Sequence, residues 1–175
     1  LAGVVVAART EDADQLRRTR TLLGSNLSPF DAYLALRRLN ERVCRRLTTA
    51  QGAKTLVFVA GSSNHFFALD AETGTVIWNR TFDTLTVPKN EDMWLCPQGI
   101  NATPTIDKTA GIIYAIALDG RLYGLDLGTG KIRFGPIQFV PPFSKNWSLN
   151  LVDGVIYTSI SQGCGSAQSG LYSID

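Results

Sequence analysis

The sequence predicts a mainly β fold of repeated hairpin units, preceded by a short α/β segment. Three observations support this prediction: a strand-turn-strand pattern occurs three times, an apolar strand precedes each copy, and the charge of the chain changes near residue 48. With 45% hydrophobic and 18% charged residues, the 175-residue chain has the composition of a globular protein. No apolar run reaches the length of a membrane-spanning helix.

The first copy of the pattern spans residues 66–78 and reads as two strands joined by a tight turn. The turn begins at Asp70 and ends at Gly74, where such turns require a positive φ. The pattern returns at residues 121–134 and, cut short, at residues 170–175. The apolar strands that precede the copies are predicted at residues 56–59, 111–116 and 154–158.

Three aspartates, Asp70, Asp126 and Asp175, end the first strand of each copy at intervals of 56 and 49 residues. This repetition predicts that each aspartate caps its turn through hydrogen bonds to the backbone. It argues against catalysis, because an active site needs one constellation rather than a copy in every repeat. A β unit that recurs about every fifty residues is typical of a propeller blade. We therefore predict an incomplete β-propeller of about two and a half blades, with the missing blades elsewhere in a full-length chain.

The motif Ala-Leu-Asp-Ala-Glu-Thr-Gly at residues 68–74, followed by Trp78, resembles the tryptophan-docking repeat of the pyrroloquinoline-quinone (PQQ) family of β-propellers. The second copy has Phe134 in place of the tryptophan, and residues 147–157 resemble another blade. The resemblance covers residues 54–175 and implies aromatic packing between blades. It also implies a periplasmic or extracellular quinoprotein-type parent, either a dehydrogenase that binds PQQ with calcium or a non-catalytic binding scaffold.

The sequence assigns no residue to catalysis, to cofactor binding or to a metal, and it does not specify the substrate. His65 is the only histidine, and we expect it to be an ordinary residue of a turn before a strand. Trp94, in the proline-containing connection at residues 83–104, has two interpretations: stacking on a planar quinone, or packing between blades, which we favour. The glycine-rich stretch at residues 161–170 matches no phosphate-binding motif and predicts a loop.

The three cysteines, Cys44, Cys96 and Cys164, are widely spaced. The chain has no Cys-x-x-Cys motif, so a zinc site is not predicted. Cys96 and Cys164 pair if the propeller part is extracytoplasmic, and otherwise they are two separate thiols in loops. The sequence leaves both interpretations open.

Residues 1–47 differ from the rest of the chain in charge. They hold nine arginines, no lysine and five acids, whereas residues 48–175 have a net charge of −2. The apolar residues 1–8 predict a strand, and helices are predicted over residues 10–24 and 28–47. The arginines of the second helix are interpreted as a solvated face, because no aromatic residues alternate with them, and no nucleic-acid partner is predicted.

Residues 48–54 have the small and polar composition of a linker. We therefore divide the chain into an α/β remnant at residues 1–47, a linker at residues 48–54 and propeller repeats at residues 55–175.

The motif Ser-Pro-Phe-Asp-Ala-Tyr-Leu at residues 28–34 gives residues 1–39 a resemblance to the transsulfuration enzymes that use pyridoxal phosphate (PLP), the cystathionine synthase and lyase group. This implies a cytoplasmic parent in sulfur amino acid metabolism. The first lysine of the chain, Lys54, lies outside the match, so we do not expect this piece alone to form the Schiff base. A third hypothesis is a truncated or chimeric gene product without function.

Overall fold

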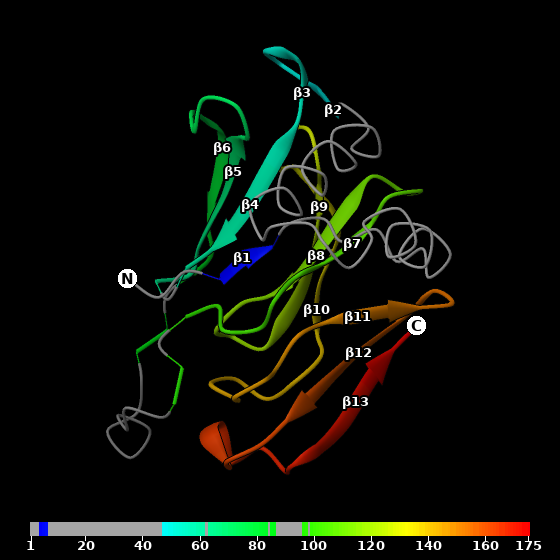
Figure 1. Cartoon of the computed structure of the whole chain (residues 1–175). Helices are drawn as coiled ribbons and strands as arrows, with labels where there is room; N and C mark the ends of the chain where they lie inside the picture. Colours follow the sequence, from blue (N-terminus) through cyan, green and yellow to red (C-terminus); the bar gives the residue numbers. More distant parts are fainter. Residues whose placement is uncertain (1–3, 7–46, 62, 84, 87–95, 98) are drawn as a thin grey trace, which may run out of the picture. The chain divides into compact units, whose positions relative to one another are not determined.

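A computed structural model describes residues 4–6, 47–61, 63–83, 85–86, 96–97 and 99–175 (Figure 1). The helices predicted over residues 10–24 and 28–47 lie outside these ranges, except for Leu47, and so do Cys44 and Trp94. In the described part, no helix is long and apolar enough to cross a membrane.

The first sheet has four antiparallel strands in the order β1-β4-β5-β6. Their bounds are Val4–Val6, Leu56–Ala60, His65–Asp70 and Val76–Thr81. Strand β1 comes from the segment before the predicted linker, yet it pairs with β4. The linker residues form a separate hairpin, β2 (Leu47–Thr49) with β3 (Gly52–Lys54). The domain boundary itself stays a prediction.

The second sheet repeats this plan with the order β10-β9-β8-β7. Its strands are β7 (Thr105–Asp107), β8 (Ile112–Ile116), β9 (Arg121–Asp126) and β10 (Ile132–Gln138). The third sheet has the order β11-β12-β13, with the bounds Asn150–Val152, Val155–Ile160 and Gly170–Ile174. A 3₁₀ turn, η1 (Cys164–Ser166), precedes β13.

The described part is thus a run of antiparallel sheets in which neighbouring strands follow one another along the chain, apart from β1 beside β4, as Figure 1 shows. This arrangement confirms the predicted mainly β fold and makes the chain a partial β-propeller. The strands predicted at residues 56–59, 111–116 and 154–158 correspond to β4, β8 and β12. The short strands β7 and β11 were not predicted, because three residues are too few to establish an alternating pattern.

The apolar side chains form two clusters, one for each pair of successive sheets. The first cluster includes Phe58 and Phe66 of the first sheet and Ile113 and Leu125 of the second. The second cluster joins the second sheet to the third and consists of Ile116, Leu122, Val140, Leu149, Ile156, Ile160 and Ala167. Residues of one strand alternate between the two clusters, because successive side chains of a strand point to opposite faces.

Trp78 connects the first sheet to the second. Its ring lies 5.9 Å from that of Phe66, nearly parallel to it, and only 9% of the tryptophan is exposed. The indole Nε1 donates a 2.9 Å hydrogen bond to the carbonyl of Leu127, 49 residues away. The ring also lies against Gly130, where an added Cβ would come within 2.6 Å of it. Aromatic packing between neighbouring blades, which the sequence resemblance implied, is therefore present.

Replacing Trp78 with alanine should destabilise the chain by about 3–5 kcal/mol, because it removes a buried aromatic side chain from between two sheets. Trp78→Phe should cost less, since it keeps a ring against Gly130 and loses chiefly the hydrogen bond to Leu127. Chemical denaturation followed by circular dichroism measures both effects. The matched control is Trp147→Ala at a half-exposed position, and an equal loss in that variant would contradict the assignment.

Candidate functional site

The connections between the strands lie at two ends of each sheet, since alternate connections of an antiparallel meander share an end. The turns after β5 and β9 belong to one end, which we call the turn end. The other end, which we call the loop end, holds the longest connections; its described residues fall within 61–64, 82–104, 117–120, 139–149 and 161–169. Binding residues of proteins concentrate on such long loops, so the loop end is the candidate site.

At the turn end, Asp70 caps its turn as predicted. Its Oδ1 accepts a 2.8 Å hydrogen bond from the Glu72 N–H, and its Oδ2 lies 2.8 Å from the Lys54 Nζ. The interaction with Lys54, followed by the Glu72 N–H, lowers the pKa of the Asp70 carboxyl below its usual value. Gly74 has φ +72°, which confirms the positive φ expected there.

Asp126 caps the equivalent turn of the second sheet. Its Oδ1 accepts hydrogen bonds from the N–H groups of Gly128 and Thr129, at 3.1 and 2.9 Å, and from the Thr129 hydroxyl at 2.8 Å. Burial alone would raise the pKa of Asp126, but these bonds and the bond from Arg133 lower it overall. The two carboxylates are structural caps, while the same role for Asp175 stays a prediction.

At the loop end, Asn64 joins the first sheet to the second. It is fully buried at φ +57°, a left-handed conformation that asparagine tolerates better than most residues. Its Oδ1 accepts a 3.1 Å hydrogen bond from the Leu118 N–H, and its Nδ2 donates a 2.8 Å hydrogen bond to the Asp83 carbonyl. This residue was not predicted from the sequence, where the local signal is limited to an asparagine directly before a strand, in the sequence Gly-Ser-Ser-Asn.

A buried carboxylate, Asp119, lies in the connection between β8 and β9. Its Oδ2 accepts a 3.0 Å hydrogen bond from the Tyr123 hydroxyl, and its Oδ1 accepts one from the Arg121 N–H at 3.0 Å. Burial, followed by the charge of Asp119, raises the pKa of Tyr123 to about 12. The phenol is therefore a donor that holds this connection in place, and it stays protonated at neutral pH.

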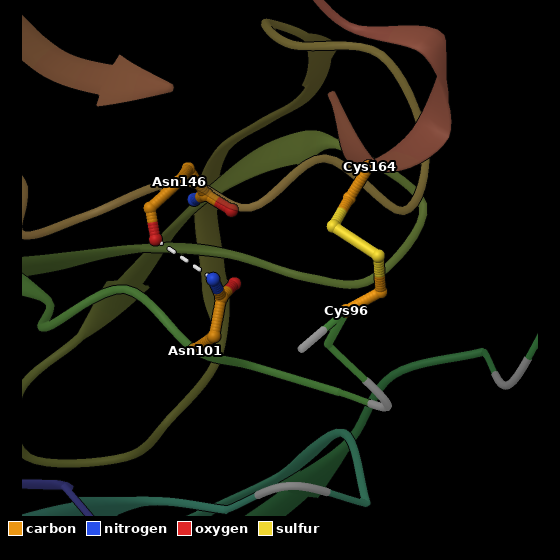
Figure 2. Close-up of a disulfide and its surroundings, with 4 residues drawn as sticks. All are labelled: Cys96, Asn101, Asn146 and Cys164. Atoms are coloured by element: carbon orange, nitrogen blue, oxygen red, sulfur yellow. Dashed lines mark hydrogen bonds between the residues drawn. A yellow bond between two sulfur atoms is a disulfide. The ribbon is translucent and has the colours of Figure 1, made fainter. Parts of the chain in front are cut away.

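Figure 2 shows the most strongly cross-linked part of the loop end. A disulfide joins Cys96 to Cys164, with the Cα atoms 5.7 Å apart, so the paired interpretation of these cysteines is the one observed. Nearby, Asn101 Nδ2 donates a 2.8 Å hydrogen bond to the Asn146 carbonyl. The side chain of Asn146 is buried, and its Nδ2 has no hydrogen-bond partner among the described residues. These contacts link Cys96 and Asn101 to the loops that flank strands β11 and β12 of the third sheet.

The half-exposed Trp147 is the most accessible aromatic ring among the described residues of the loop end. Trp147 is 50% exposed, and the Lys145 Nζ lies 5.7 Å from the centroid of the indole ring. The indole Nε1 donates a 2.9 Å hydrogen bond to the Ser161 hydroxyl. A fixed aromatic plane beside a cation can hold a planar or anionic group. This pair is the best candidate contact surface that the described loops offer.

His65 is the first residue of β5 rather than a turn residue, which corrects the expectation from sequence. Its Nδ1 lies 3.0 Å from the Thr81 hydroxyl on the paired strand β6. The prediction failed because the turn ends one residue earlier, at the left-handed Asn64. Within the described ranges, no group of three or more His, Cys, Asp or Glu residues could hold a metal ion.

No family model matches the chain, and no curated protein matches it. Among solved structures, it is similar to the quinohemoprotein alcohol dehydrogenase from Comamonas testosteroni, with 21% identity and a TM-score of 0.46, over 63% of this chain and 16% of that chain. It is also similar to BamB from Moraxella catarrhalis, with 24% identity and a TM-score of 0.40, over 70% of this chain and 36% of that chain. The chain thus spans well under two thirds of the length of either structure.

Nothing in these comparisons supports the resemblance of residues 1–39 to PLP-dependent enzymes. The residues that carry it lie outside the described part, apart from the strand Val4–Val6.

Acid should destabilise the protein as the capping carboxylates become protonated. Because the pKa values of Asp70 and Asp126 are lowered, their stabilisation is present above the ordinary carboxyl pKa and is lost as the pH falls through the lowered value. The melting temperature should therefore fall steeply below about pH 4. In Lys54→Met this acid dependence should be shallower, since Asp70 loses its cation.

The control for this pH series is Lys108→Met, which removes an exposed lysine with no ion pair in the described part of the chain. Identical pH profiles for the wild type and Lys54→Met would show that the ion pair with Asp70 contributes nothing.

Proposed function

We propose that this chain is part of an extracytoplasmic β-propeller whose loop end serves as a binding scaffold. The observation that carries the proposal is the disulfide between Cys96 and Cys164, which joins a long connection to the loop of the third sheet. Disulfides form and persist in oxidising compartments and are rare in the cytosol. The predicted periplasmic or extracellular location is consistent with this bond.

Rigid loops favour binding, because less conformational entropy is lost when a partner is bound. Three cross-links restrain the loop end: the disulfide, the bonds of Asn64, and the bond from Asn101 to the Asn146 carbonyl. They leave the ring of Trp147 accessible on this restrained surface. We infer that Trp147 and Lys145 contact the bound partner.

A PQQ-dependent dehydrogenase is the second candidate, favoured by the plane of Trp147 beside the Lys145 cation. PQQ is planar and carries several carboxylates, so these two side chains fit part of what it requires. Calcium requires oxygen ligands such as carboxylates, and the described residues contain no cluster of acids for it. The described blades therefore fit a PQQ–calcium pair only in part, and we derive no catalytic step from it.

The other two hypotheses have less support. A PLP enzyme needs a free lysine for the Schiff base, and the first lysine, Lys54, is held 2.8 Å from Asp70. A chain without function remains the alternative if neither export nor ligand binding is found in the experiments below.

The disulfide should form only when the chain is exported. A version directed to the bacterial periplasm should contain no free thiol at Cys96 or Cys164, whereas a cytoplasmic version should be alkylated at both. Because the cysteines are 68 residues apart, the bond should contribute about 4 kcal/mol by the loop-entropy relation. The double variant Cys96→Ser/Cys164→Ser should melt correspondingly lower, with Cys44→Ser as the control. Equal stability with and without the bond would remove the main support for the proposal.

A titration with PQQ and calcium separates the two candidates. For a binding scaffold we expect no quinone absorbance that survives dialysis. Retained PQQ that is lost in Trp147→Ala and in Lys145→Met, but not in the control Lys108→Met, would favour the dehydrogenase and overturn the scaffold proposal.

A further inference from the structure

The residues that carry the Trp147 ring are fixed to the third sheet. Residues 145–147 lie antiparallel to residues 159–161, at the end of β12. The Trp147 N–H donates a 2.9 Å hydrogen bond to the Ser159 carbonyl, and the Trp147 carbonyl accepts one of 2.9 Å from the Thr158 hydroxyl. Both backbone groups of Trp147 are therefore engaged and are not available to pair with the backbone of a partner.

The side chains of this pairing alternate between the interior and the solvent. Asn146 forms a bridge with Ile160, and only 3% of Asn146 and 2% of Ile160 are exposed. Because successive side chains of an extended chain point to opposite sides, the residues before and after these two point toward the solvent. None of these neighbours is buried. We call the four of them the indole patch: Lys145, Trp147, Ser159 and Ser161.

The indole patch combines a fixed apolar plane with hydroxyl groups and a cation. The indole Nε1 donates a 2.9 Å hydrogen bond to the Ser161 hydroxyl, which sets the orientation of the ring. That hydroxyl keeps its own proton for a ligand, and Ser159 is exposed. The Lys145 Nζ lies 5.7 Å from the ring centroid, beyond the contact distance of about 4 Å. A ligand that lies on the indole would therefore meet hydroxyl groups and a positive charge at its edge.

We propose that the indole patch binds an acidic sugar, a hexuronate unit of a glycan. A pyranose ring has a flat face of C–H groups, which fits on the indole, and a rim of hydroxyl groups, which hydrogen-bond to Ser159 and Ser161. The carboxylate of the hexuronate pairs with the Lys145 ammonium. This inference rests on the proposed binding function of the loop end and names the class of its ligand.

Two other kinds of ligand use less of the indole patch. An extended peptide gains affinity mainly from backbone hydrogen bonds, and those of Trp147 are already made within the chain. A planar quinone uses the ring and the cation, and the PQQ titration described above tests for it. The two serine hydroxyls beside the ring favour a ligand that carries many hydroxyl groups, and Lys145 favours an anionic one.

Calorimetric titration of the full chain compares trigalacturonate, an acidic oligosaccharide, with maltotriose, a neutral one. We expect a millimolar Kd for trigalacturonate and about tenfold weaker binding of maltotriose. Sodium chloride at about 0.5 M should remove most of this difference, because salt screens exposed charges. The protein is used with the bond between Cys96 and Cys164 formed, as verified by alkylation.

Variants assign the two parts of the recognition. Trp147→Ala should weaken the binding of both oligosaccharides at least about tenfold, because it removes the plane on which the sugar lies. Lys145→Met should leave the binding of maltotriose unchanged and bring the affinity for trigalacturonate to within about twofold of it. The matched control is Lys108→Met, which removes an exposed lysine from the turn between β7 and β8 and should change neither affinity.

The inference is overturned if trigalacturonate gives no heat of binding up to about 20 mM, or if Trp147→Ala binds it as well as the wild type does. Equal affinity of the wild type for the two oligosaccharides would overturn the preference for an acidic sugar. The location proposed for the chain fails separately, since it is tested by the state of the cysteines after export and not by sugar binding.

Discussion

The contact of the Trp78 indole with the second sheet is the interaction on which the rest of the structure depends. Successive sheets of this array share no strand, so no backbone hydrogen-bond ladder joins them. Their cohesion comes from side chains between the sheets, where the indole stacks on Phe66 and reaches the Leu127 carbonyl. Each sheet of such an array contacts only the sheets beside it. The stability of one sheet therefore depends on how well it packs against its neighbours.

This junction imposes a double constraint on one residue. Gly130 must adopt a positive φ to close the turn that Asp126 caps, and it must also lack a side chain so that the indole can approach. A local requirement of the turn and a long-range requirement of packing therefore coincide. For this reason the turn motif predicts the fold of the whole chain. The residues that shape the hairpin are also the residues against which the neighbouring sheet packs.

The separation of interacting residues along the chain determines how much of the structure the sequence could predict. The turns at Asp70 and Asp126 were predictable because their partners lie within five residues and the motif is repeated. Asn64 was not, since its partners are 19 and 54 residues away and nothing local indicates them. The buried Asn146 was missed for a similar reason, because its burial arises from sheets that meet only in the folded chain. The candidate site at the loop end was therefore less predictable than the fold.

The disulfide also affects how the protein responds to force. Cys96 and Cys164 are separated by 68 positions, and the segment between them contains the whole second sheet and strands β11 and β12. If the chain is pulled from its ends, tension passes through the sulfur atoms and bypasses the enclosed strands. About 240 Å of contour length stays hidden until the bond is reduced. The second sheet is thus shielded mechanically, while the first sheet, whose four strands all precede Cys96 in the chain, bears the load.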